Sequence, residues 1–305
     1  HIINNPAPLV ALVLMVLGMA IKMALFPLHG WLPDAYTYAP STSSALIAPT
    51  GTKVASYVMI RVMFFIFGFD VVTKMIPLTQ VIAWMSAAGI IYGSILAIAQ
   101  KELKRMLAYS SVAQVGYIGL GIGLANPLGL IGAVLHVLNH AFMKGCLFLV
   151  AANFRFRLGH SNIFKLDDSI RKKMPWTMAA FTVAALSMVG LPPMGGFFSK
   201  WYLAMGTIKN SNWLFLAVIL ISSLLNAVYF FRVIEKVYMK PMNTKNNHDE
   251  IHDKPVKEED MEIKSIEVGA SMLIPTLIMA AGLIVLGLFN AFIVKGILAY
   301  IIPNG

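Results

Sequence analysis

The chain has 305 residues, of which 58% are hydrophobic and 12% are charged, and its formal net charge is +10. An ordinary soluble domain has roughly a quarter of its residues charged, so water is excluded as the solvent of most of this chain. Most Lys and Arg residues lie in short loops between apolar segments, where positive charge reports membrane topology, so we expect no nucleic-acid partner.

Hydrophobic segments of about 20 residues recur along the chain, and each can cross a hydrocarbon core roughly 30 Å thick as a helix. In chain order the predicted spans are 8–36, 44–67, 76–99, 106–124, 128–152, 176–206, 213–238 and 268–295. Buried helices of a soluble protein, the alternative, would be shorter and would alternate apolar and polar faces. The sequence therefore predicts an all-α polytopic membrane protein with about eight transmembrane spans.

Two of these spans are predicted to be discontinuous. The first contains Pro27 and Pro33 in the segment FPLHGWLPDAY. The sixth contains the segment GLPPMGG, whose prolines and glycines are Gly190, Pro192, Pro193, Gly195 and Gly196. Proline removes a helical hydrogen bond and glycine supplies backbone freedom. Broken backbone at membrane depth is tolerated where it lines protein or water, so both spans predict transport sites, with a packing kink as the alternative.

Four lysines lie well within apolar spans, and they are Lys22, Lys53, Lys144 and Lys200. A charged side chain at the centre of a membrane helix costs about 2.5 to 3.5 kcal/mol on insertion scales. Burial favours the neutral form of an amine, so a buried lysine can exchange protons near neutral pH, which an arginine cannot. We predict that these lysines face the protein interior, and snorkelling toward the interface is the alternative for each.

The fifth span contains HVLNHAFMKG, which puts His136, His140 and Lys144 at successive intervals of four, on one face of a helix. Histidine titrates near neutral pH and exchanges protons at either ring nitrogen, so this row suits proton relay. Two histidines four residues apart also suit a metal, but no carboxylate lies between them, and we expect no metal site. A hydrogen-bonded pair of core histidines is a further alternative.

Polar residues of the fourth span can extend this row, and they are Tyr109, Ser110, Ser111 and Gln114. Taken alone, they would be interpreted as helix-packing residues. Cys146 is the only cysteine, so no disulfide or cysteine-ligated metal is predicted within the chain. We expect no cofactor and no catalytic centre in this chain.

Charges in the loops predict the topology. Because each predicted span takes the chain to the other side of the membrane, alternate loops lie on the same side. The connection 101–105, the stretch 155–173 and the segment 239–264 therefore share one side, whereas the loops on the opposite side contain only Lys74 and Lys209. This asymmetry predicts basic loops on the cytoplasmic side of a prokaryotic cytoplasmic membrane. The segment 239–264 mixes both charge signs with few large apolar residues, so we predict a solvated loop.

Five segments carry a resemblance to a known family. They are KMALFPLHGWLPDAYTYAP (22–40), TGTKVASYVMIR (50–61), ELKRMLAYSSVAQVGYIGLG (102–121), HVLNHAFMKGCLF (136–148) and LPPMGGFFSKWY (191–202). In these segments the chain resembles the antiporter-type, proton-translocating subunits of respiratory complex I, of the multisubunit Mrp sodium/proton antiporters (subunits A and D) and of membrane-bound energy-converting hydrogenases.

The resemblance implies a fold. A complete subunit of the family has fourteen core helices in two inverted five-helix repeats, each with one discontinuous helix, and this chain resembles helices seven to fourteen. Residues 1–67 then end the first repeat, 68–238 form the second, 239–264 are the loop and 265–305 the C-terminal helix. Two broken spans, each followed by an intact one, also favour an internal repeat.

The resemblance also implies a proton relay. Its residues are Lys22, Lys53, His136, His140, Lys144 and Lys200. In the family, the residue that matches Lys22 pairs with a glutamate on helix five, which has no counterpart here. The chain opens at His1 without an initiator methionine. We therefore expect a missing N-terminal half, or a second polypeptide, to provide the first helices.

The leading functional hypothesis is a proton-translocating subunit of a multisubunit redox-driven complex. With no redox motif in the chain, the driving reaction must occur in other membrane-complex subunits, which are the expected partners along with protons and the lipid bilayer. The second hypothesis is an Mrp-type Na⁺/H⁺ antiporter subunit, which would also handle Na⁺. The third is a non-conducting membrane anchor for catalytic subunits, which would leave the buried lysines unexplained.

Overall fold

A computed structural model describes residues 6–239 and 265–298, and these are almost entirely helical. They contain no β-strand beyond an isolated bridge between Glu102 and Asn162. The α-helices are α1 (Pro6–Met23), α2 (Trp31–Tyr38), α3 (Ser41–Ile60), α4 (Leu78–Ala99), α5 (Leu103–Gly123), α6 (Pro127–Leu158), α7 (Ser169–Lys173), α8 (Pro175–Val189), α9 (Gly195–Lys209), α10 (Trp213–Tyr238), α11 (Ala270–Leu288) and α12 (Asn290–Ile293). Short helical turns of other types follow α3 and α12 and precede α7.

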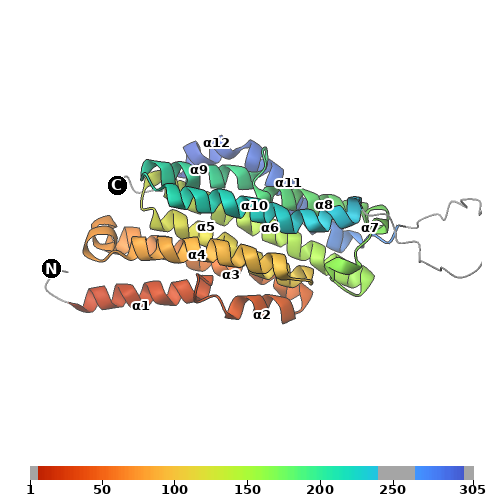
Figure 1. Ribbon diagram of the computed structural model, residues 1–305, viewed down its shortest axis with the longest axis horizontal. Coiled ribbons are helices and arrows are strands. Elements are labelled where there is room, and N and C mark those ends of the chain that lie inside the picture. Colours follow the sequence, from red (N-terminus) through yellow and green to blue (C-terminus); the bar gives the residue numbers. More distant parts are fainter. Residues whose placement is uncertain (1–5, 240–264, 299–305) are drawn as a thin grey trace, which may run out of the picture.

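The long helices form one bundle along the long axis of the molecule, with α5 and α6 at its centre and α1 at one edge (Figure 1). Nearly every residue of α5 is buried, because α4, α6 and α2 pack around it. Helix α6 packs against α3, α5, α8, α9 and α11. The buried side chains of these two central helices are therefore remote from lipid.

Six helices are long and apolar enough to cross a membrane: α1, α3 with its extension to Phe67, α4, α6, α10 and α11. Helix α8 is apolar but shorter. The predicted first span consists of α1 and α2, the sixth consists of α8 and α9, and α5 is the predicted fourth span. The prediction of an all-α polytopic membrane protein with about eight spans, two of them discontinuous, is confirmed.

The first break lies between α1 and α2. Pro27 lies in the segment that joins the two helices. The indole of Trp31 donates to the carbonyl of Ile21 (2.8 Å), one of the acceptors at the end of α1. The prediction that Pro33 helps to interrupt the helix is wrong. Pro33 lies in the first turn of α2, where its missing amide hydrogen has no helical partner to lose.

The second break lies between Val189 and Gly195. Gly190 has a φ of +92°, a left-handed conformation that glycine adopts at no steric cost, and it ends α8. Gly195 and Gly196 begin α9, so the prediction that they loosen the break is wrong. A Cβ atom on Gly196 would overlap the carbonyl oxygen of Ser187, so glycine here permits the close approach of α8 and α9.

The basic loops lie together at one end of the bundle, where α2 and α7 are found in Figure 1. Lys104 Nζ donates to Ala39 O (2.7 Å), which joins the start of α5 to the end of α2. Ile163 N donates to Lys101 O (2.9 Å), which joins the loop after α6 to the same region. The grouping predicted from parity is thus observed for the loops 101–105 and 155–173. The third basic segment, 239–264, lies outside the described residues except for Met239.

Replacing Gly196 with Ala is expected to destabilise the protein, because the new methyl group meets the backbone of α8 and forces the two half-helices apart. Overpacking of this kind costs about 1 to 3 kcal/mol or more. The measurement is the midpoint of heat-induced loss of the monodisperse species in detergent. Gly30→Ala is the control, because a Cβ atom at Gly30 meets nothing within 4 Å. Equal midpoints for Gly196→Ala and Gly30→Ala would contradict the close approach of α9 to α8.

Candidate functional site

The site is a polar core along α6. His136, His140 and Lys144 are all 0% exposed and follow one another on the face that helical spacing predicts. The rings of His136 and His140 are stacked, with centroids 5.9 Å apart. His140 is also close enough to Lys53 and Lys144 to experience the charge of both. The row therefore brings protonatable groups of α3 and α6 together in the interior.

The ring of His136 hydrogen-bonds at both nitrogens. Nε2 is 2.9 Å from Gln114 Oε1 on α5, and Nδ1 is 2.9 Å from Ser199 Oγ on α9. The amide oxygen can only accept, so Nε2 is the donor of the first bond. The hydroxyl of Ser199 can donate to Nδ1 of a neutral ring, or it can accept from Nδ1 of a charged ring and donate to Gly196 O (3.1 Å). Rotation of one hydroxyl thus satisfies both charge states of His136.

Lys144 is held by α5. Its Nζ donates to Leu107 O (2.7 Å) and to Ser110 Oγ. The hydroxyl of Ser111 donates to the same carbonyl (3.0 Å). Of the predicted polar residues on the fourth span, Ser110 and Gln114 contact the α6 row directly, whereas Tyr109 is half-buried and packs against apolar core residues.

Lys53 is 5% exposed on α3, and its Nζ donates to the carbonyl of Ala48. The residue after Ala48 is Pro49, which lies inside α3 and has no amide hydrogen. Its missing amide hydrogen leaves the carbonyl of Ala45, not that of Ala48, without a helical donor.

Lys200 is 6% exposed near the start of α9, and its amine lies at the broken end of α8. Nζ donates to Met188 O (2.9 Å), Val189 O (3.0 Å) and Ser223 Oγ (3.2 Å). It also lies 4.9 Å from the centre of the Tyr117 ring. The last carbonyls of a helix carry partial negative charge and have no helical partner, so the break itself provides a cation site.

The buried lysines have no carboxylate partner among residues 6–239 and 265–298. The ion pairs of this part of the chain are Lys74 with Asp70 and Arg105 with Asp34, and all four side chains are exposed. Charge on the interior amines is therefore balanced by carbonyl dipoles, hydroxyl groups and an aromatic ring. Such ligands stabilise a cation without fixing its proton as a buried carboxylate would.

His140 differs from its neighbours because neither ring nitrogen hydrogen-bonds another described residue. The hydroxyl oxygen of Thr52 is also buried, and it likewise has no hydrogen-bond partner among the described residues. Buried polar groups nearly always have a hydrogen-bond partner, so this part of the core has the donors and acceptors that ordered water uses.

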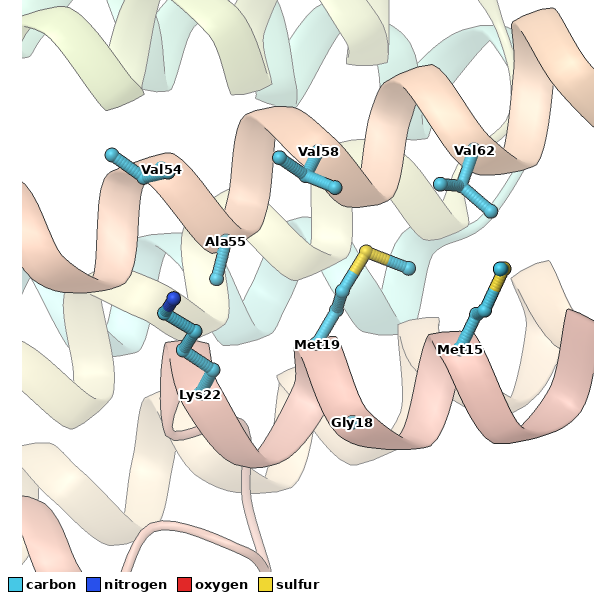
Figure 2. A pocket seen from close by; sticks show the side chains of 8 residues that line it. All are labelled: Met15, Gly18, Met19, Lys22, Val54, Ala55, Val58 and Val62. Carbon is cyan, nitrogen blue, oxygen red and sulfur yellow. The ribbon is translucent and has the colours of Figure 1, made fainter.

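Lys22, which the sequence predicts to face the interior, is exposed in the part of the molecule that the structure describes. Helix α1 buries the face that contains Leu12, Val16 and Ala20, whereas Lys22 is exposed on another face. Lys22 lines a groove of about 340 Å³ between α1 and α3, which is otherwise apolar. Figure 2 shows Met15, Met19 and Lys22 pointing from α1 toward α3 across this groove.

A polar face of α10 also belongs to the site, and the sequence analysis missed it. Ser222, Asn226 and Tyr229 are 0% exposed. With the oxygen of its amide toward the site, Asn226 accepts from Lys200 Nζ and Gln114 Nε2, each at 3.2 Å. The spacing of four and three residues within an apolar span is the signal that could have indicated this face.

Comparison with known proteins gives a family. The model described as "NADH:quinone oxidoreductase/Mrp antiporter, TM" matches residues 1–226. The NADH-quinone oxidoreductase subunit N of Desulforudis audaxviator is 49% identical over 304 residues, which are 99% of this chain and 59% of that protein. The chain thus spans little more than half the length of this relative.

Solved structures share the fold. The Mrp complex from Dietzia sp. DQ12-45-1b contains a chain that matches with a TM-score of 0.82 at 24% identity, over 96% of this chain and 59% of that one. The membrane-bound sulfane sulfur reductase, an archaeal respiratory membrane complex, matches with a TM-score of 0.79 at 29% identity, over 94% of this chain and 54% of that one.

Lys144→Met is expected to leave the stability of the folded protein unchanged or to raise it, because the cost of burying an amine disappears while the volume of the side chain is nearly kept. Leu147→Ala is the control. Leu147 is 0% exposed on the same helix, and its truncation should cost about 2 to 5 kcal/mol. Thermal midpoints in detergent compare the two variants. An equal loss in Lys144→Met would mean that the amine is a structural element.

Proposed function

The chain belongs to the NADH:quinone oxidoreductase/Mrp antiporter transmembrane family, and we propose that it is a proton-translocating subunit of a multisubunit, redox-driven membrane complex. The observation that carries this proposal is the row of buried amines and imidazoles whose ligands are carbonyl and hydroxyl groups. A permanently charged buried amine would be expected beside an opposite charge, whereas these neutral ligands support a group that gains and loses a proton.

The proposed relay begins at Lys53, continues through His140 and Lys144, and reaches Lys200 by way of His136. His140 faces the charges of Lys53 and Lys144, and its ring stacks on His136. His136 contacts Ser199, the residue beside Lys200 on α9. Each amine is a cation while it holds the proton and is neutral after the proton leaves. Water at His140 would complete the connections that direct contacts leave open.

We propose that the groove between α1 and α3 receives a helix from the preceding part of a longer subunit, or from a second polypeptide, with a carboxylate opposite Lys22. The groove is apolar apart from this amine, so an apolar helix with one acid complements it. The length of the 49% identical relative, of which this chain covers 59%, leaves room for such a segment. Residues 1–67 would then end a first inverted repeat and 68–238 form a second.

The surroundings of the subunit follow from the same proposal. The basic loops face the cytoplasm of a prokaryotic cell, and the neighbours are other membrane subunits of the complex. The protein is an integral membrane protein of several apolar helices. No residue of the proposed relay is a redox group, so electrons are handled by other subunits.

An Mrp-type Na⁺/H⁺ antiporter subunit is the second candidate, favoured by the TM-score of 0.82 with the Dietzia chain. Identity to that chain is 24%, which supports a shared fold alone. The 49% identity to an oxidoreductase subunit favours the redox-driven complex. Dependence of proton transport on added Na⁺ distinguishes the two, because Na⁺ is required only in the antiporter.

The central test replaces Lys144 and Lys200 individually with Ala and with Arg. Alanine removes the proton carrier, and arginine keeps the charge but holds its proton too tightly to release it. Proton uptake by sealed vesicles that contain the intact complex should fall strongly in all four variants, by about a hundredfold if the relay is the main path, because a positioned proton carrier contributes at least that much. Assembly should be unchanged.

The control for this test is Lys209→Ala, at an exposed position near the end of α9, which should transport protons like the unsubstituted complex. Full proton transport by the arginine variants, with normal assembly, would show that Lys144 and Lys200 act only as fixed charges and do not carry protons. Full transport by the alanine variants would favour a non-conducting anchor.

Occupation of the groove by a helix is tested by maleimide labelling of introduced cysteines, in a protein whose Cys146 is replaced by Ser. Val58→Cys should react with a maleimide in detergent when the chain is expressed alone, since Val58 is 40% exposed, and should be protected in the intact complex. Lys209→Cys, at the exposed last residue of α9, should react in both preparations. Equal reaction of Val58→Cys in both would show that no helix occupies the groove.

A further inference from the structure

Helix α11 is an outer helix of the bundle that follows the second broken helix. It packs against α8 and α9, the two halves of that helix, and against α6. In Figure 1 it lies beside α8 and α9. It contains no titratable side chain, so α11 adds no proton carrier to the polar core. It nevertheless contacts the broken helix at both ends of α8.

The first contact is at the start of α8. The carboxylate of Glu267, three residues before the first residue of α11, accepts four hydrogen bonds. Oε2 accepts from Trp176 N (3.0 Å) and Thr177 N (3.2 Å), and Oε1 accepts from Thr177 Oγ1 (2.6 Å) and Val268 N (3.2 Å). The first amides of a helix have no helical partner, and a negative charge beside them is favourable. Glu267 therefore caps α8 from a segment that lies 91 positions later in the chain than Trp176.

This cap is attached to α6 as well. Arg157, near the end of α6, donates to the carbonyl of Glu267 (2.6 Å). Further into the bundle, Nδ2 of Asn153 donates to the hydroxyl groups of Thr177 and Thr276 (3.3 Å each), and Asn153 is 0% exposed. Because Thr276 belongs to α11, hydrogen bonds join the start of α8 to both α6 and α11.

The second contact is at the break that follows α8. Gly287 lies in the last turn of α11 and is buried. A Cβ atom at this position would overlap the carbonyl oxygen of Pro193 and would lie 2.9 Å from Gly195 N. Pro193 belongs to the segment between α8 and α9, and Gly195 begins α9. Glycine at position 287 therefore lets α11 lie against the backbone of the break itself.

Between these two contacts lies the helix that receives Lys200. Helix α8 has 15 residues, and its last carbonyls, at Met188 and Val189, accept from Lys200 Nζ (2.9 and 3.0 Å). Hydrogen bonds within a helix fix its length at about 1.5 Å for each residue. Contacts at the two ends of α8 therefore set the position of these carbonyls along the bundle.

We propose that α11 and residues 265–269 clamp α8 at both ends, with Glu267 and Gly287 as positioning residues that hold the last carbonyls of α8 at Lys200. This inference rests on the proposed proton-translocating function. Neither residue is among the hydrogen-bond partners of Lys200, so each acts through the position of α8.

Displacement of these carbonyls affects the two charge states of Lys200 unequally. The ammonium group loses oxygen ligands, whereas the neutral amine needs fewer of them. Proton uptake should therefore fall more at alkaline pH than at acid pH, because protons are scarce at alkaline pH and the charged form has lost support. The titratable groups that face Lys200 are Tyr117 of α5, His136 of α6 and, beyond Asn226, Tyr229 of α10. Helices α8 and α11 contain none.

The test uses the intact complex in sealed vesicles, with proton uptake measured across a series of pH values. Gly287→Ala adds a methyl group against the break. Glu267→Gln keeps the size of the side chain, but all four partners of the carboxylate are donors, and the NH₂ group of glutamine cannot accept. Each variant should lower uptake at alkaline pH about tenfold, the effect of weakening one hydrogen bond to a charged group, and should lower it less at acid pH.

Each variant has a matched control. Gly269→Ala, just before α11, adds a methyl group that meets nothing within 4 Å. Asp70→Asn removes one carboxylate at an exposed position, where its partner is Lys74 (2.8 Å). Both controls should transport protons like the unsubstituted complex at every pH.

Should Gly287→Ala fail to assemble, Glu267→Gln decides, because it acts at the opposite end of α8 and adds no bulk. Unchanged uptake in the assembled variants, or uptake lowered by the same factor at every pH, would overturn the clamp while the transport function stands. Absence of proton uptake by the unsubstituted complex would overturn the proposed function and the clamp together.

Discussion

A cation inside a membrane protein needs oxygen ligands, and in this interior they come from the backbone. No Asp or Glu is buried in the part of the chain that the structure describes, yet Lys104 at the basic end of the bundle is buried, and so are three lysines of the polar core, Lys53, Lys144 and Lys200. Each of their amines donates to at least one main-chain carbonyl, at Ala48, Leu107 or Met188. Peptide dipoles lower the cost of the charged state but do not compete for the proton, so these amines are held in place and can still exchange protons.

This constraint accounts for the position of the second break. The end of α8 at Gly190 leaves Met188 O and Val189 O without helical donors, and both carbonyls receive Lys200. Gly196 lets α9 lie close to α8, and this brings Lys200 within reach of the freed carbonyls. The break and the lysine therefore form one unit.

Lys22 differs from the interior lysines because it lies in an exposed groove. The interior lysines are enclosed by helices of this chain, but Lys22 is on the outer surface of α1 in an otherwise apolar groove. An amine in apolar surroundings is costly at membrane depth, so a partner with an acidic group is the expected occupant. In the proposal, the additional chain of the longer relative corresponds to the segment that provides it.

Local patterns in the sequence determined the fold class, the spans, the presence of two discontinuous helices and the row of His136, His140 and Lys144, because segment length and helical spacing depend only on neighbouring residues. Contacts between distant segments decided the rest. The outward direction of Lys22, the close packing at Gly196 and the contact of Asn226 with Lys200 depend on which face of one helix meets which face of another. The carbonyls that receive each lysine are likewise set by tertiary packing, since every residue has a carbonyl and the sequence cannot mark the one that an amine will reach.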